Sequence, residues 1–102
     1  MIIGAGDTGE RVFRYLTYEG TSKRRVVGFL DDDPTKRGQR IHGVPVLGSR
    51  AMLSTLIRDA HVLEVLVAIN DPPGDLLQFV QRCCETDGIG WKVVTAGVTV
   101  AA

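Results

Sequence analysis

The sequence has no charge of one sign in excess and no long apolar run. Its 102 residues include 12 Lys or Arg and 12 Asp or Glu, so the formal net charge is zero. A nucleic-acid-binding protein normally carries a basic surplus on one face, so a nucleic-acid partner is not expected. The longest uncharged apolar stretch is Val65–Ile69, far short of the ~20 residues that span a bilayer. This chain is therefore expected to lie outside the membrane.

Two further absences concern the compartment. No basic segment followed by an apolar core opens the chain, so a signal peptide is not expected. The only cysteines, Cys83 and Cys84, are adjacent and lack the C-x-x-C spacing of a redox or zinc motif. They continue an apolar helical stripe, which predicts that at least one of them is a small core residue. Together these features predict a domain of the reducing cytoplasm.

Strand and helix patterns alternate along the whole chain. Apolar runs typical of strands cover Met1–Ile3, Arg25–Leu30, Val62–Ile69 and Trp91–Thr95, and Pro45 places the short extended piece Ile41–Leu47 at a sheet edge. Helical periodicity predicts three helices. The first runs from Thr8 to about Tyr18 and ends at Gly20, and the third runs over Asp75–Thr86 and ends at Gly88. The second is capped by Ser49 and has an apolar face from Leu53 to Ala60. The polar segment Asp31–Arg40 has the composition of a loop.

This alternation predicts one α/β domain over residues 1–102. The expected architecture is a Rossmann-like, doubly wound, open parallel sheet with helices on both faces, a three-layer αβα arrangement. The first strand, Met1–Ile3, is shorter than the ~5–6 residues typical of strands, although this topology makes it central. We therefore expect the chain to be a piece of a longer protein.

A G-x-G-x-x-G motif follows that first strand and opens the first helix. Gly4 would permit the tight turn, Gly6 would let the backbone approach a pyrophosphate, and Gly9 would allow close helix–strand packing. Ala5 and Thr8 complete the loop, and the helix N-terminus would present free N–H groups to phosphates. The alternative is a glycine-rich turn that binds nothing.

An acidic residue completes the nucleotide-binding pattern. Asp31 ends the second strand 22 residues after Gly9, where a carboxylate can accept from the ribose hydroxyls of a dinucleotide. A carboxylate there favours a free 2′-hydroxyl, although Lys36 nearby would also accommodate a phosphate. Asp32 is a second candidate ligand residue, with a solvated turn as the alternative.

Three more residues join the candidate site. Ala68 and Asn70 end the central strand beside the glycine loop, and Asn70 either hydrogen-bonds a ribose or base or forms a turn. Asp7 is unusual within the loop because its charge would repel a pyrophosphate. We interpret it as a helix cap at the edge of the site.

Catalytic patterns are missing from the sequence. Neither Tyr15 nor Tyr18 has a lysine four residues later, the pair that a short-chain dehydrogenase needs. A G-x-S-x-G motif and a P-loop lysine are also absent. His42 and His61 lack metal-ligand spacing, so no metal site is predicted. The sequence predicts a domain that binds without reacting.

Three segments carry a family resemblance: IIGAGDTGE, then VVGFLDDDPTKRGQRIHGVPVLGS, then EVLVAI. Over about residues 1–95 they resemble the Rossmann-like, CoA-binding-like domain of bacterial nucleotide-sugar 4,6-dehydratases and epimerases, which act in capsule and O-antigen polysaccharide biosynthesis. The resemblance implies a non-catalytic accessory domain, with the membrane segment and the dehydratase domain elsewhere in a parent chain anchored at the cytoplasmic face of the inner membrane. It implies NAD as the expected ligand, with NADP, CoA or a UDP-sugar as alternatives.

Two other readings stay open. The GFLDDDP and G-x-P-V-L-G segments are similar to the UDP-sugar-binding N-terminal domains of sugar acyltransferases, whose loop usually carries Gly-His where this chain has Asp7-Thr8. The third reading is a NAD- or CoA-sensing domain like those of redox-responsive repressors, although no DNA-binding segment is present here. A homo-oligomer is compatible with all three readings.

Overall fold

The computed structural model describes residues 1–19, 24–95 and 98–100. These residues form a seven-stranded sheet in the order β3-β4-β2-β1-β5-β6-β7. The strands are β1 (Ile2–Ile3), β2 (Phe29–Leu30), β3 (Arg40–Ile41), β4 (Val44–Gly48), β5 (Glu64–Val67), β6 (Gly90–Thr95) and β7 (Val98–Val100). The α-helices are α1 (Asp7–Arg14), α2 (Leu53–Asp59) and α3 (Gly74–Asp87).

The centre of the sheet is parallel and its two edges are antiparallel. Strand β1 lies between β2 and β5, with Ile2 opposite Phe29 on one side and Leu66 on the other. Strands β4 and β6 continue the parallel part, whereas β3 and β7 pair antiparallel with their neighbours. The prediction of a central first strand in a parallel sheet is confirmed.

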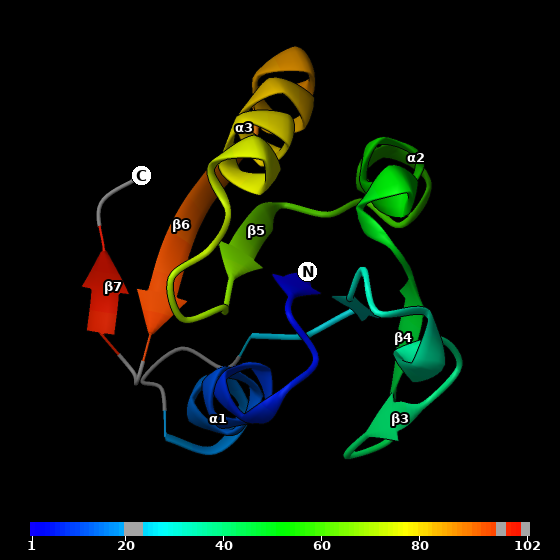
Figure 1. Ribbon diagram of the computed structural model, residues 1–102, viewed down its shortest axis with the longest axis vertical. Coiled ribbons are helices and arrows are strands. Elements are labelled where there is room, and N and C mark those ends of the chain that lie inside the picture. The colour runs from blue at the N-terminus through cyan, green and yellow to red at the C-terminus, as the bar shows by residue number, and fades with distance from the viewer. Residues whose placement is uncertain (20–23, 96–97, 101–102) are drawn as a thin grey trace.

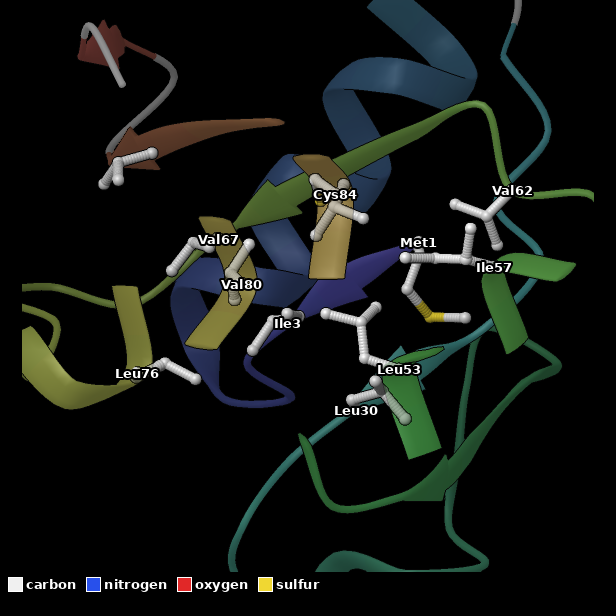
Figure 2. Packing of buried hydrophobic residues seen from close by; sticks show 12 residues of the cluster. Met1, Ile3, Leu30, Leu53, Ile57, Val62, Val67, Leu76, Val80 and Cys84 are labelled. Carbon is white, nitrogen blue, oxygen red and sulfur yellow. The ribbon is translucent and has the colours of Figure 1, made fainter. Parts of the chain in front are cut away.

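Helices cover both faces of this sheet (Figure 1). On one face α1 packs Val12 and Phe13 against Ile2 and Phe29. On the other face α2 and α3 cover the larger apolar cluster, which Figure 2 shows around Ile3. The three-layer, doubly wound α/β fold predicted from the sequence is therefore confirmed.

The larger cluster contains one of the two cysteines. Cys84 is fully buried from α3, and burial raises the pKa of its thiol to about 11. Cys83 is half-buried and packs against the same cluster, and both thiols are free. The left-handed Gly88, at φ 67°, ends α3 as predicted. The prediction that at least one of the two cysteines is a core residue is confirmed by Cys84.

The central strands are shorter than the apolar runs that predicted them. The run Arg25–Leu30 contributes only Phe29 and Leu30 to β2, and Val62–Ile69 contributes only Glu64–Val67 to β5. On the β1 side, β2 pairs only through Phe29 and Leu30, whereas all of β5 pairs with β6. Hydrophobicity predicted the burial of Val65–Ala68, but it predicted neither the number of paired residues nor the position of Leu63, whose side chain is 85% exposed.

The piece Ile41–Leu47 is also different from the prediction. It splits into a hairpin, in which β3 pairs antiparallel with β4 and His42 takes a left-handed φ of 50° in the turn. The strand that contains Pro45 is second from the edge, with β3 outside it. The hairpin does lie at the sheet edge, but Pro45 itself has a neighbouring strand on each side.

Two helical segments extend beyond the prediction. The first helix begins at Asp7 and continues after Arg14 as a π-helical turn, Tyr15–Glu19; its expected end at Gly20 lies outside the described residues. The predicted loop after β2 contains a short 3-10 helix, Pro34–Lys36. Ser49 caps a 3-10 turn that leads directly into α2. Within residues 1–19, 24–95 and 98–100, none of the helices is long and apolar enough to cross a membrane.

Candidate functional site

The loops that leave β1, β2 and β5 meet at the carboxyl edge of the sheet. The backbone N–H of Gly4 donates to Leu30 O at 2.7 Å, and the N–H of Ala68 donates to Ile3 O at 2.8 Å. These bonds continue the ladder just past each strand and hold the glycine loop between its two neighbours. In open α/β sheets this edge, beside the first strand, is where ligands bind.

Gly4 and Gly9 have the packing roles predicted for them. Gly4 has a φ of +110°, and a Cβ there would lie 2.5 Å from Ala68 O. A Cβ on Gly9 would lie 1.8 Å from Gly4 O. Because the obstacle at both positions is backbone, neither position tolerates a side chain without movement of the loop. These two glycines bring helix and strand together whether or not a ligand binds.

Gly6 differs from both, because no backbone atom would obstruct a side chain there. Its φ is −94° and its ψ is −158°, an extended conformation that other residues also adopt. The one atom near a Cβ at this position is Lys36 Nζ, at 3.6 Å. The fold therefore does not require glycine at position 6. A bare backbone facing a lysine ammonium is suited to the close approach of an anion.

Asp31 ties the glycine loop to the loop that follows β2. Its Oδ2 accepts from the backbone N–H of Ala5 at 2.9 Å, and Lys36 Nζ lies 3.8 Å from the same oxygen. Its Oδ1 accepts from the N–H of Asp33 at 2.9 Å. The structure thus brings Asp31 and Lys36 together with the glycine loop, and it shows a scaffolding contact of Asp31 that sequence spacing did not predict.

Asp33 positions Lys36. Its Oδ1 accepts from the hydroxyl of Thr35 at 2.7 Å and from the N–H of Thr35 at 3.0 Å, capping the 3-10 turn Pro34–Lys36. Both bonds lower the pKa of the Asp33 carboxyl, and the bond from the Thr35 hydroxyl has the larger effect. Asp33 and Pro34 thus initiate a turn that directs Lys36 back over Gly6.

The interpretation of Asp7 as the cap of the first helix is wrong. Gly6 is the N-cap, no side chain caps this end, and Asp7 is the first helical residue with its side chain exposed. The first intrahelical bond runs from Glu10 N–H to Gly6 O at 3.0 Å. The N–H groups of the first turn, which includes Thr8, thus have no partner within the helix. The Asp7 carboxylate lies in that turn, where the helix dipole favours a negative charge.

Asp32 points to a different partner. Its carboxylate accepts from the backbone N–H of Arg50 at 2.9 Å and from Arg50 Nε at 2.6 Å. Arg50 Nη1 also donates to Asp75 Oδ2 at 2.9 Å. The bond to Asp32 above all, and the bond to Asp75 as well, raise the pKa of the guanidinium. This cluster joins the β2 loop to the start of α3. The separations of 18 and 25 residues gave no signal for it in the sequence.

The end of β5 contributes one buried and one exposed residue. Ala68 is buried, and its carbonyl oxygen lies against Gly4. Asn70 is exposed at the start of the loop that leads to α3, and the next residue, Asp71, has a left-handed φ of 53°. The side chain of Asn70 makes no hydrogen bond to any other described residue. Its side chain is thus exposed at the carboxyl edge, next to the turn at Asp71.

Metal ligands are not gathered anywhere in the described part of the chain, where no three His, Cys, Asp or Glu side chains could hold an ion together. His42 stacks on Phe13, with ring centroids 5.5 Å apart and planes 5° from parallel, and its Nε2 lies 3.5 Å from Glu10 Oε1. His61 is exposed just past α2. His42 thus packs against the side chain of Phe13, and His61 lies in the segment that follows α2.

A family model and a curated relative match this chain. The model of the CoA-binding domain family matches residues 1–89. The probable polysaccharide biosynthesis protein EpsC of Bacillus subtilis (strain 168) is 29% identical over 94 residues. That match covers 92% of this chain and 16% of EpsC, so the chain spans about a sixth of the length of that relative.

Two solved proteins share the fold. RSP, a Rex-family repressor, superimposes with a TM-score of 0.75 at 22% identity, over 99% of this chain and 46% of that one. Its complex with β-NADH gives a TM-score of 0.70 at 25% identity, over 92% and 43%. UDP-D-quinovosamine 4-dehydrogenase from Vibrio fischeri gives 0.69 at 22% identity, over 92% and 73%.

The family match covers well over half of the chain and includes every residue of the carboxyl-edge site. The glycine loop, Asp31, Lys36 and the end of β5 all lie within residues 1–89. Family membership and the geometry of the site thus concern the same segment. The chain belongs to the CoA-binding domain family.

Proposed function

We propose that this chain is a non-catalytic, nucleotide-binding accessory domain whose ligand lies across Gly4–Gly9. The observation that carries the proposal is the open face of Gly6 beneath Lys36, with Gly4 and Gly9 closing the turn on either side. A loop built only for packing has no need of a bare position beside a lysine. NAD is the ligand we expect, and NADP, CoA and a UDP-sugar share the diphosphate that this position would receive.

The phosphate end of the ligand would meet two kinds of donor. The free N–H groups of the first turn of α1 and the positive end of its dipole favour an anion. Lys36 Nζ adds a full charge on the open side of Gly6, and its attraction to a diphosphate would compete with its 3.8 Å contact to Asp31. The negative charge of Asp7 in the same turn opposes this attraction in part.

The ribose end would meet Asp31. Each carboxylate oxygen has two lone pairs, and the bonds to Ala5 and Asp33 use one on each oxygen. Ribose hydroxyls can therefore donate to Asp31 while the loop stays tied. Asn70 and Ala68 would border the ligand on the β5 side. Asp32 is held by Arg50 and would contact the ligand only after that ion pair opened.

The relatives support a role in polysaccharide biosynthesis. EpsC carries that description, and the Vibrio protein of the same fold is a UDP-sugar dehydrogenase by name. We propose that this domain serves a cytoplasmic nucleotide-sugar epimerase or dehydratase anchored at the inner membrane, with catalysis elsewhere in the parent chain. A UDP-sugar-binding domain of an acyltransferase is the alternative from the same biosynthetic setting.

A second candidate function is ligand sensing. The structure of RSP bound to β-NADH is 25% identical to this chain over 92% of its length, and that protein also binds operator DNA. A sensor and an accessory domain would bind NAD at the same loop. They differ in the consequence of binding, because a sensor changes its association with a partner when the ligand binds. A NADH-dependent change in the association of the parent protein would therefore favour sensing.

Calorimetric titration of NAD, NADP, CoA and UDP into the wild-type chain and Asp31→Ala tests the proposal. Charge-assisted hydrogen bonds contribute ~1.5–3 kcal/mol each, so Asp31→Ala should weaken nucleotide binding at least about tenfold. Asp31→Asn is the matched control, because its amide oxygen can still accept from the N–H of Ala5. Failure of all four compounds to bind the wild type at millimolar concentration would refute the proposed function.

A further inference from the structure

An ion-pair network lies at the carboxyl edge of the sheet, beside the residue that would hold a ribose. Arg50 begins the 3-10 turn after β4, and its Nε donates to Asp32 Oδ2 at 2.6 Å. Its Nη1 donates to Asp75 Oδ2 at 2.9 Å, and Asp75 lies in the first turn of α3. The helices that follow Arg50 and Asp75 cover the same face of the sheet (Figure 1). The network therefore joins the loop after β2 to the starts of two helical segments.

Backbone hydrogen bonds hold this network next to Asp31. The N–H of Asp31 donates to Gly48 O at 2.9 Å, and the N–H of Arg50 donates to Asp32 Oδ1 at 2.9 Å. Strand β2 lies between β1 and β4, so the two consecutive carboxylates have partners on opposite sides: Asp31 binds Ala5 of the glycine loop, and Asp32 binds Arg50. A ribose on Asp31 would therefore have the network as its neighbour on the side away from the glycine loop.

The charges around this position are mostly negative. Arg50 is only 26% exposed and has two carboxylates for its one positive charge, those of Asp32 and Asp75. Both carboxylates stabilise the charged guanidinium, Asp32 more strongly, and they raise its pKa. The second cation of the site, Lys36, already lies 3.8 Å from the carboxylate of Asp31. A group that arrives beside the ribose would thus meet three carboxylates and two cations that are each paired with them.

We propose that the network of Arg50 with Asp32 and Asp75 makes the site select nucleotides with free ribose hydroxyls and reject those with a phosphate on the ribose. This inference rests on the proposed function, because it requires a ribose on Asp31. The free hydroxyls need only the remaining lone pairs of that carboxylate. The guanidinium has further N–H groups, but a phosphate dianion that reached them would lie against the two carboxylates that already hold it.

Two pairs of nucleotides isolate the ribose phosphate from the rest of the ligand. NADP differs from NAD only by a phosphate on the 2′-oxygen of the adenosine ribose, and CoA differs from dephospho-CoA only by one on the 3′-oxygen. Adenine and diphosphate are the same within each pair. The inference favours NAD and dephospho-CoA, so it predicts that this member of the CoA-binding domain family does not prefer CoA itself.

Asp75 is a positioning residue that can be changed without altering the ligand contacts proposed above. Its side chain is 76% exposed, and exposed ion pairs contribute little to stability, so Asp75→Asn should leave the fold intact. The substitution removes one negative charge and weakens the hold on Arg50. Asp71→Asn is the matched control, because Asp71 is exposed in the loop before α3 but is not an ion-pair partner of Arg50. Asparagine also adopts the left-handed φ of 53° found at that position.

Calorimetric titration of the two nucleotide pairs into the wild type, Asp75→Asn and Asp71→Asn tests the inference. The wild type should bind NAD and dephospho-CoA at least about tenfold more tightly than NADP and CoA, respectively. Asp75→Asn should raise the affinity for NADP and CoA about three- to fivefold, the size of one partly exposed charge interaction, and should leave the affinity for NAD within about twofold. Asp71→Asn should change all four affinities by less than about twofold, because solvent and salt screen its exposed charge.

Equal affinities of the wild type for the two members of a pair would overturn the inference. An affinity for NADP in Asp75→Asn that is no higher than in Asp71→Asn would overturn it as well, because the network would then have no part in the selection. Both results leave the proposed function intact, since nucleotides bind in both cases. Failure of all four compounds to bind the wild type would instead refute the proposed function, and this inference with it.

Discussion

Gly6→Ala separates ligand binding from folding at the glycine loop. The backbone of Gly6 is extended, with φ −94° and ψ −158°, so alanine fits without strain. The added methyl group would lie 3.6 Å from Lys36 Nζ, an ordinary van der Waals distance at the end of a flexible side chain. It would also occupy the space through which a phosphate reaches the backbone.

The two effects of this substitution differ in size. Alanine is a poorer N-cap than glycine by less than about 1 kcal/mol, and its smaller unfolded-state entropy recovers roughly 0.4–1 kcal/mol. The free energy of unfolding should therefore stay within about 1 kcal/mol of the wild type. Loss of even one charge-assisted bond to phosphate costs ~1.5–3 kcal/mol, roughly 10- to 150-fold in Kd.

Urea unfolding and calorimetric titration with NAD measure these two quantities on the same samples. Gly90→Ala is the matched control, because its Cβ would meet nothing within 4 Å and it lies in β6 away from the site. The reasoning is refuted if Gly6→Ala binds NAD as tightly as the wild type does, or if it unfolds the domain. Unfolding would make Gly6 a packing residue like Gly9, and unchanged affinity would show that no phosphate approaches the backbone at this position.

Three further predictions concern the fold. Gly9→Ala should lower the free energy of unfolding by at least about 2 kcal/mol, because its Cβ would lie 1.8 Å from the carbonyl oxygen of Gly4; a wild-type urea midpoint would contradict this packing. The Cys84 thiol, with its pKa raised by burial to about 11, should resist iodoacetamide at pH 8 until the chain unfolds, and rapid native-state labelling would contradict its burial. Burial lowers the pKa of the Met1 amine, so the unfolded chain binds more protons and the free energy of unfolding should rise as the pH approaches 8. N-acetylation should abolish this rise, and the same slope in the acetylated chain would count against it.

The sequence predicted the fold because its signals are local. Apolar runs, periodic helices and Gly88 each indicate structure within a few residues, and the right-handed crossover rule orders the parallel strands. The packing role of Gly9 follows from the same local geometry, because its obstacle is the carbonyl oxygen of Gly4. At Gly4 the obstacle is Ala68 O, which belongs to a neighbouring strand end.

Features that depend on distant partners could not be predicted. Arg50 joins Asp32 to Asp75 through contacts 18 and 25 residues apart, and no periodicity indicates such a pairing. The bond between Asp31 and the N–H of Ala5 likewise depends on how two loops meet. Asp7 was misread because a carboxylate in the first turn suits both a cap and the helix dipole, and only the backbone path shows that Gly6 is the N-cap.

Titration of NAD into the isotopically labelled chain, followed by backbone amide NMR, tests the central claim most directly. The account predicts saturable shifts at the N–H groups of residues 5–9, with smaller shifts at Lys36 and Asn70 and none at Val26 and Val27, which precede β2 at the other end of the strands. Unchanged amide signals at residues 5–9 with millimolar NAD, NADP, CoA and UDP would contradict it.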